Sequence, residues 1–267
     1  MKKNFKDLLS INSKPFIIAE ISANHLGDIV KAKRLIAAAK NAGASAVKIQ
    51  TYEASSMTID SSRADFKIKH GMWKGQKLYD LYKQAQTPFN WHEDLFDFAK
   101  KEGIIIFSTP FDNEGVDLLE KLKVPFYKIA SFEITDLLLI EYIASKKKPV
   151  FLSTGIATEK EIGDALEIIK SKGVKDILLF HCISSYPAKV EEYNLQMINT
   201  LKKTFNTLVG LSDHSLGSEA SIGAIALGAV AIEKHFKLNQ SDNSPDSEFS
   251  IDPQQMKELI NKVNKVW

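Results

Sequence analysis

The sequence has 267 residues, of which 44% are hydrophobic and 25% are charged, and its formal net charge is +2. This balance is typical of a folded globular protein and excludes an intrinsically disordered chain. The longest basic run, 146–148, is interpreted as a solvated helix end, and no aromatic or glycine-rich RNA signature accompanies it, so we expect no nucleic-acid partner.

The single cysteine, Cys182, excludes a disulfide framework and a cysteine-based zinc site, and a reducing compartment is the natural expectation. Residues 1–7 begin basic but lack the long apolar core of a signal peptide. No apolar run approaches the roughly 20 residues that a membrane span needs. We therefore expect a cytoplasmic protein without a membrane partner.

Eight short apolar runs, rich in β-branched residues, recur along the chain, and a helical pattern follows each of them. They are continuous rather than alternating, which is typical of strands covered on both faces. The predicted strands are 16–21, 46–50, 104–108, 126–130, 150–153, 177–181, 207–211 and 229–234.

The predicted helices carry their own start and stop signals, which are capping side chains, a first-turn proline or a terminal glycine. These signals are Gly43 after 28–42, Thr87-Pro88, the capping box of Thr158 and Glu161 with Gly173 as its stop, and Asp252-Pro253.

Eight repeats of strand then helix indicate parallel strands joined by right-handed crossovers. Eight units in about 250 residues match a (β/α)8 TIM barrel, here placed at 15–267 after an N-terminal extension, 1–14. A doubly wound open sheet is the alternative. It usually has fewer units, and the sequence contains no G-x-G-x-x-G turn or P-loop.

One connection is longer than the rest. Residues 51–87 separate the second strand from its helix and include an amphipathic piece, 77–86. The loops that follow strands lie on the catalytic face of such a barrel, so we expect this insertion to wall the substrate pocket. An insertion without a functional role is the alternative.

Polar residues stand where the predicted strands end. Lys48 and Lys128 lie within apolar strands, and a buried lysine is costly unless an anion partners it. Together with a set of hydroxyls they form a ring suited to a phosphate and a carboxylate. The alternative for each lysine alone is a salt bridge to a neighbouring glutamate. The hydroxyls are those of Thr109, Ser131, Ser153, Ser184 and Ser212.

His214 and His235 end adjacent strands, so their imidazoles are expected to converge on one metal ion. Two histidines with oxygen ligands and water suit Mn²⁺, Co²⁺ or Zn²⁺ acting as a Lewis acid on a carbonyl. The alternative is two hydrogen-bonded core histidines.

The remaining histidines divide between the rim, where His25 and His181 are expected, and surface or loop positions for His70 and His92. A Schiff-base mechanism with a strand lysine as nucleophile is a further alternative. It would use Lys48, Lys128 or Lys234. The two histidines and the hydroxyl ring favour metal-assisted addition instead.

Several strand-end segments resemble the barrel domain of the sialic acid synthase family, over about residues 14–252. They are 17–25, 44–51, 127–133, 211–216 and 232–236. The pseudaminic acid synthase branch is similar at 63–66, 71–73, 78–82, 85–88 and 244–250. The neuraminate branch typically has a histidine and a lysine after the equivalent of Asp246 and an asparagine at Ser184, and this chain has neither.

The resemblance implies condensation of phosphoenolpyruvate (PEP) with an amino-sugar aldose, 2,4-diacetamido-2,4,6-trideoxy-altrose, to give a nonulosonic acid and phosphate by C–O cleavage. It implies that Lys48, Lys128 and the hydroxyl ring bind PEP, and that His214 and His235 bind a divalent cation, with Mn²⁺ expected and Co²⁺ or Mg²⁺ as alternatives. The other implied roles are Glu20 for activating water, Glu133 as a proton relay, and Gln50, Tyr186 and Asp246 as sugar contacts.

Family members usually continue into a small antifreeze-like (SAF) domain, which reaches across a homodimer to the partner's sugar site. The sequence stops at Trp267, so we expect a barrel that lacks this domain, with its oligomeric state open. A neuraminate or legionaminate synthase is the alternative in the same class. A non-catalytic barrel that binds the sugar or PEP is the alternative in another class.

Overall fold

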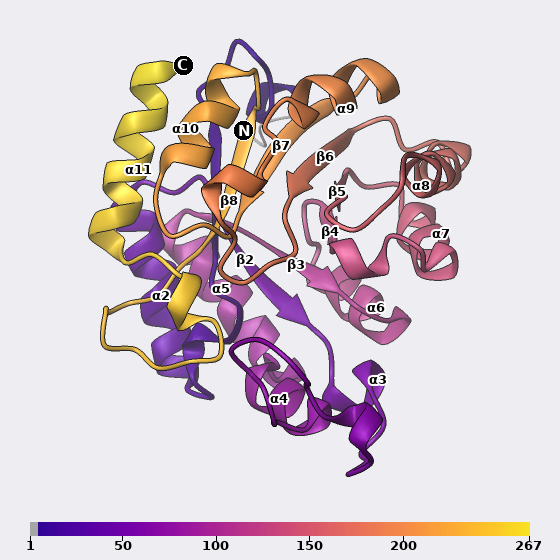
Figure 1. Ribbon diagram of the computed structural model, residues 1–267, viewed down its shortest axis with the longest axis vertical. Coiled ribbons are helices and arrows are strands. Elements are labelled where there is room, and N and C mark those ends of the chain that lie inside the picture. Colours follow the sequence, from indigo (N-terminus) through magenta and orange to yellow (C-terminus); the bar gives the residue numbers. More distant parts are fainter. Residues whose placement is uncertain (1–4) are drawn as a thin grey trace.

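The eight predicted strands all form, and they close into a parallel barrel in sequence order (Figure 1). The computed structural model describes residues 5–267. The predicted bounds shift by at most two residues at either end. The strands are β1 (Phe16–Glu20), β2 (Ala46–Thr51), β3 (Ile105–Pro110), β4 (Tyr127–Ile129), β5 (Val150–Ser153), β6 (Ile177–Cys182), β7 (Leu208–Asp213) and β8 (Ala231–His235).

The first and last strands pair in parallel, from Phe16 opposite Ala231 to Glu20 opposite His235. This pairing closes the sheet and excludes the doubly wound alternative. A helix follows each strand and covers the outside of the barrel (Figure 1). These helices are α2 (Ile29–Ala42), α5 (His92–Glu102), α6 (Asn113–Lys121), α7 (Leu137–Ser145), α8 (Glu159–Ser171), α9 (Met197–Phe205), α10 (Glu219–Ala226) and α11 (Pro253–Val266).

Most of the predicted helix signals are confirmed. Gly43 ends α2 in the left-handed region at φ 97°, where the missing Cβ avoids a clash. Thr158 and Glu161 form the predicted capping box of α8. Asp252 caps α11 in the same way, with a proline at the first position. The ends of these helices are therefore set by local sequence.

The helix start predicted at Thr87-Pro88 was wrong. The helix α5 begins at His92, after a separate 3-10 turn at Phe89–Trp91. The Thr87 hydroxyl is buried and caps nothing within the described part of the chain. The proline supplies a turn here rather than the first residue of the helix.

The lower part of the barrel is filled by aromatic side chains. Phe107, Phe126, Phe151 and Phe180 contact one another, with ring centroids as close as 4.5 Å for Phe126 and Phe151. Phe5, from the short helix α1 (Phe5–Leu8), contacts Phe151 at 6.1 Å. Because this floor is apolar and closed, the polar layer above it faces only the carboxyl ends of the strands.

The long connection after β2 folds into short pieces beyond the tip of that strand (Figure 1). It contains α3 (Ala54–Met57), a 3-10 turn at Ala64–Phe66 and α4 (Leu78–Ala85). A single antiparallel bridge joins Lys67 to Lys77. The amphipathic piece predicted at 77–86 is therefore confirmed as α4, at the end of the barrel where the strands finish.

Within residues 5–267, we find no helix that combines the length and the apolar surface required to cross a membrane.

Candidate active site

Four charged side chains meet inside the barrel, above the phenylalanine floor. Lys48 forms an ion pair with Glu20, the residue opposite it on β1. The Lys48 ammonium also lies 3.6 Å from Glu233, and the Lys128 ammonium lies 3.2 Å from the same carboxylate. All four are almost fully buried. The two predicted PEP lysines are thus brought together, each with a carboxylate partner.

Burial and mutual attraction act against each other in this cluster. Burial raises the pKa of Glu20 to about 7, although Lys48 opposes the rise. Burial also penalises the charged form of Glu233, but Lys128 and Lys48 outweigh it and lower the Glu233 pKa to about 2. The Glu20 and Glu233 carboxylates overcome the effect of burial on Lys48 and raise its pKa.

Of the two lysines, Lys128 has its buried charge less fully compensated by carboxylates. Burial lowers its pKa, and the attraction of Glu233 offsets this only in part. Within residues 5–267, both of its hydrogen bonds go to Glu233, and its ammonium lies 5.0 Å from the centroid of the Phe180 ring. A lysine has three donors, so Lys128 can bind an anion without losing its carboxylate partner.

Hydroxyl groups surround the cluster as predicted. Thr109 accepts a hydrogen bond from Lys48 at 3.2 Å, and Ser212 donates one to Glu233 at 3.1 Å. Ser153 is buried at the end of β5. Each of these side chains faces the barrel interior because alternate residues of a strand share a face.

A second group of hydroxyls lies where β4, β5 and β6 end. The Ser131 hydroxyl accepts a hydrogen bond from the Gly155 amide and lies 3.1 Å from the Cys182 sulfur. A Cβ added at Gly155 would lie 2.7 Å from the Ser184 hydroxyl and 2.6 Å from that sulfur. Only glycine leaves this space free, and the Ser184 hydroxyl beside it lacks a hydrogen-bond partner among residues 5–267.

The two predicted metal ligands lie side by side, with ring centroids 5.5 Å apart. His214 Nδ1 lies 2.8 Å from the Ile183 carbonyl, so this nitrogen carries the proton and Nε2 is left as a free acceptor. Burial lowers the pKa of His214 to about 4, and burial together with nearby positive groups such as Lys48 and Lys128 lowers the pKa of His235 well below its usual value. Both rings are therefore neutral, which is the form that binds metals.

Further observations bear on how well this pair fits a cation. His235 Nδ1 is buried and accepts no hydrogen bond within the described chain; Asp246 is 3.8 Å away. No set of three or more His, Cys, Asp or Glu side chains in residues 5–267 is arranged to hold a metal ion. The pair thus fits a cation that takes its remaining ligands from substrate and water.

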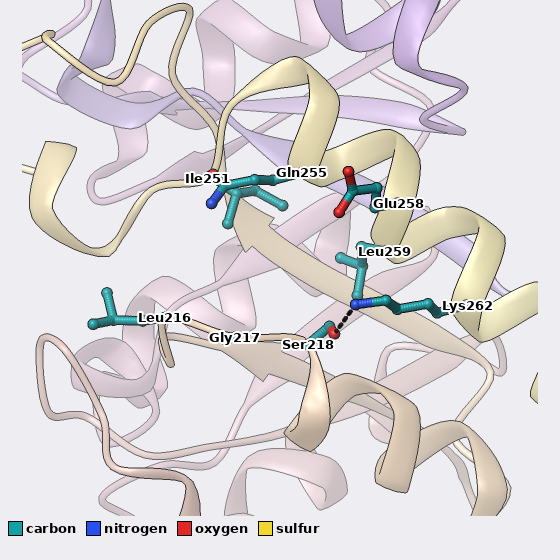
Figure 2. Close-up of a pocket in the computed structure, with 8 residues that line it drawn as sticks. All are labelled: Leu216, Gly217, Ser218, Ile251, Gln255, Glu258, Leu259 and Lys262. Atoms are coloured by element: carbon teal, nitrogen blue, oxygen red, sulfur yellow. Dashed lines mark hydrogen bonds between the residues drawn. The ribbon is translucent and has the colours of Figure 1, made fainter.

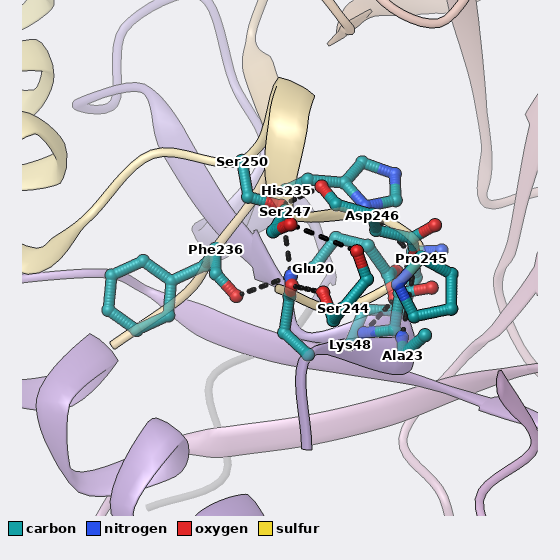
Figure 3. A network of polar contacts seen from close by, with 12 residues as sticks. Glu20, Ala23, Lys48, His235, Phe236, Ser244, Pro245, Asp246, Ser247 and Ser250 are labelled. Atoms are coloured by element: carbon teal, nitrogen blue, oxygen red, sulfur yellow. Dashed lines mark hydrogen bonds and ion pairs between the residues drawn. The ribbon is translucent and has the colours of Figure 1, made fainter. Parts of the chain in front are cut away.

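The loop after β8 places Asp246 beside His235, at the carboxyl end of that strand (Figure 3). Its carboxylate accepts a hydrogen bond from the Ala23 amide at 3.3 Å, and burial raises its pKa. Asn24 holds the loop from below by donating to the Phe236 carbonyl and to Ser250, and it accepts from Ser244. The segment after β1 therefore fixes the position of this sugar candidate.

The other two sugar candidates lie at the same mouth. The Tyr186 ring contacts the His214 ring at 4.4 Å. Gln50 is half-buried on β2, opposite Thr109. Glu133 lies in a 3-10 turn after β4, and burial raises its pKa to about 7.

Glu233 links both lysines, although it was not among the predicted site residues. A signal was present, because Glu233 stands two residues before His235 on the same strand and so shares its face. By the same rule the intervening Lys234 points outward, where it forms a fully buried ion pair with Asp213 at 3.0 Å. The interpretation of Lys234 as a possible Schiff-base nucleophile was wrong.

The prediction of a surface or loop position was wrong for His92. This side chain is buried between β2 and α5, where it contacts Thr51 at 2.8 Å and the Pro88 carbonyl at 3.0 Å. His70 is exposed as expected. His181 points out of the barrel toward the Tyr193 carbonyl, 2.6 Å away, and His25 packs edge-on against Trp91.

A small pocket of about 120 Å³ lies elsewhere, between α11 and the start of α10 (Figure 2). None of the predicted site residues lines it. Its lining residues are Leu216, Gly217, Ser218, Ile251, Gln255, Glu258, Leu259 and Lys262. The chemistry therefore concentrates in the barrel mouth and not in this pocket.

Comparisons with known proteins point to one family. Residues 35–267 match the NeuB family. The chain is 48% identical over 254 residues to a pseudaminic acid synthase of Campylobacter jejuni, covering 95% of this chain and 74% of that protein. It is 39% identical over 256 residues to an N,N'-diacetyllegionaminic acid synthase of the same species, covering 95% and 76%.

A solved structure agrees with the sequence matches. The crystal structure of an N-acetylneuraminic acid synthetase from Leptospira borgpetersenii, in complex with citrate, superposes with a TM-score of 0.86 at 33% identity. The match covers 96% of this chain and 84% of that one.

Proposed function

The chain belongs to the NeuB family, and from this premise we propose that it is a pseudaminic acid synthase. It condenses PEP with 2,4-diacetamido-2,4,6-trideoxy-altrose to form a nonulosonic acid and phosphate. The site observation that carries the proposal is the buried cluster of Lys48 and Lys128 with their surrounding hydroxyls, directly below the histidine pair.

The electrostatics of the cluster support binding of an anion with several charges. Lys48 and Lys128 are positive, Glu233 is negative, and Glu20 has a pKa of about 7. Near neutral pH the cluster is therefore positive whenever Glu20 holds a proton. Lysines supply point charges and hydroxyls fill the remaining acceptor positions, as the phosphate and carboxylate of PEP require.

The reaction forms one carbon–carbon bond and one carbon–oxygen bond to water, and it breaks the carbon–oxygen bond to phosphate. The enol carbon of PEP attacks the aldehyde carbon of the open-chain sugar, whose oxygen takes up a proton. Water adds to the cationic carbon that results, and phosphate leaves with its bridging oxygen to give the keto acid. Glu20, ionised for part of the time at neutral pH, is suited to orient this water and accept its proton.

Other residues of the chain serve binding and proton movement. Glu133 has a raised pKa and a buried oxygen without a hydrogen-bond partner in the described chain, which suits a proton relay. Gln50, Tyr186 and Asp246 face the mouth and would contact the sugar. A divalent cation held by His214 and His235, Mn²⁺ or alternatively Co²⁺ or Mg²⁺, would polarise the aldehyde carbonyl.

The choice of sugar rests on the comparisons. Identity is 48% to the pseudaminic acid synthase and 39% to the legionaminic acid synthase. Parallel assays with PEP and each aldose, followed by phosphate release, test the choice. We expect the highest kcat/KM with 2,4-diacetamido-2,4,6-trideoxy-altrose, and a preference for N-acetylmannosamine would overturn it.

A non-catalytic barrel that binds PEP or the sugar is distinguished by the same assays. With excess Mn²⁺ we expect phosphate release that depends on the aldose, whereas a binding module would show only ligand-induced stabilisation. We also place the enzyme in the cytoplasm, where PEP is available and where its single buried cysteine stays reduced.

A further inference from the structure

Three aromatic side chains connect the histidine pair to the insertion after β2. They are Trp73, Tyr186 and Phe249, and together we call them the aromatic wall. Tyr186 contacts His214 at 4.4 Å and Phe249 contacts His235 at 4.7 Å, measured between ring centroids. Tyr186 and Phe249 contact each other at 5.1 Å. The inner end of the wall thus touches both candidate metal ligands.

Trp73 forms the outer end of the wall. Its ring lies 6.1 Å from Tyr186 and 6.5 Å from Phe249. Its indole N–H donates to the Pro245 carbonyl at 3.0 Å, on the loop that carries Asp246. The insertion is therefore attached to the barrel mouth at this residue.

The anchoring of Trp73 limits what it can offer a ligand. The indole has one hydrogen-bond donor and no acceptor, and Pro245 occupies that donor. The part of the half-buried ring that remains exposed can therefore give only apolar and aromatic contact. Asp246 and Gln50 supply polar groups at the same mouth, so the sugar site has a polar side and an apolar side.

The direction of the sugar follows from the chemistry of the proposed function, on which this inference rests. The aldehyde carbon must meet the PEP enol carbon near the lysine cluster and the histidines. The far end of the open chain, with its C6 methyl group, then runs outward along the aromatic wall toward Trp73.

We propose that Trp73 is a specificity-determining residue that packs against the apolar end of the aldose, and so selects a 6-deoxy, N-acetylated sugar over one with a hydroxyl at C6. A hydroxyl placed against an apolar wall loses hydrogen bonds to water without gaining a partner. Discrimination by such a wall amounts to roughly tenfold to a hundredfold.

The test compares two aldoses that differ only at C6. We would measure kcat/KM for 2,4-diacetamido-2,4,6-trideoxy-altrose and for its 6-hydroxy analogue in wild type and in Trp73→Ala. The ratio of the two values should fall by about tenfold in the variant, through a higher KM for the 6-deoxy sugar. The KM for PEP should not change. An unchanged ratio would overturn the proposal.

Trp73→Phe separates contact with the sugar from attachment of the loop. It keeps an aromatic ring but loses the hydrogen bond to Pro245. We expect it to retain most of the selectivity, and a loss as large as in Trp73→Ala would show that the attachment decides. Trp267→Phe is the matched control, because its indole also donates to a carbonyl, that of Ile11, and it lies outside the wall.

Failure of the proposed function gives a different pattern. If wild type prefers another aldose, the sugar assignment fails, while the variant-to-wild-type ratio still reports on Trp73. Calorimetric titration of each aldose into PEP-loaded enzyme supplies the same ratio as dissociation constants if turnover is absent. A ratio that Trp73→Ala leaves unchanged there would overturn the inference as well.

Discussion

Buried charged groups lie on both the inner and the outer face of the barrel wall, around Lys48 and Lys128 inside and around Lys234 outside, and they differ in how fully they are hydrogen-bonded. On the outside, the Asp213 carboxylate accepts from Tyr193, Ser215 and Ser221 as well as from Lys234. Lys234 also donates to the Ser215 and Gly217 carbonyls.

On the inside, by contrast, both Lys128 hydrogen bonds go to one carboxylate, that of Glu233. Burial lowers the pKa of Lys128 and that of Lys234 alike, so the two faces differ in their hydrogen bonds and not in these shifts. A fully satisfied pair contributes to structure, whereas incompletely satisfied charges can still bind a ligand. Burial of charge alone therefore does not identify an active site, whereas hydrogen-bond donors and acceptors without a partner in the protein do.

The largest expected effect is on the inner group. Lys128→Met removes an anion contact but leaves Glu233 paired with Lys48 and Ser212. Loss of one partner of a buried charge-assisted contact costs about 2–5 kcal/mol, so kcat/KM for PEP should fall roughly 30- to 5,000-fold. Phosphate-release kinetics measure this. The matched control is Lys160→Met, which replaces an exposed lysine. Equal losses of kcat/KM in both variants would contradict a role for the inner lysines in binding PEP.

The next effect is on the outer group. Lys234→Met leaves the Asp213 carboxylate buried without its cation, which costs about 3–5 kcal/mol of stability. Urea unfolding should show this loss, while the KM for PEP of the folded fraction stays close to that of wild type. A rise in that KM as large as in Lys128→Met would mean that the outer pair also takes part in binding.

The smallest expected effect concerns Glu133, a carboxylate that belongs to neither the inner nor the outer group. Burial raises the pKa of Glu133 from 4.5 to about 7. The folded protein holds this proton more tightly than the unfolded chain does. The resulting stability is present below about pH 4.5 and is lost as the pH rises through about 7.

Glu133→Gln removes that dependence. The stability of the variant should be within about 1 kcal/mol of wild type near pH 5 and should exceed it by about 3 kcal/mol near pH 8, as a shift of 2.5 pKa units implies. Thermal unfolding at both pH values measures the difference, with the exposed Glu167→Gln as control. A constant difference across this range would exclude a buried, raised-pKa Glu133.

The repeating pattern of the sequence predicts the closed barrel and most of the side chains that meet in the candidate site. Lys48 and Lys128 stood out because a lysine within an apolar strand needs an anion, and the eightfold alternation of strand and helix placed both at one end of a barrel. Local signals such as the Thr158 capping box and Gly43 act over a few residues, and such signals can be read directly.

Only the tertiary structure decided which faces and loops meet. It joined Glu233 to Lys128, 105 residues away in sequence, buried His92 between β2 and α5, and brought Trp73 against Pro245, 172 residues away in sequence. These outcomes depend on strand register and on long-range packing. Neither leaves a local pattern in the chain, because the energy of each contact comes from a partner on another element.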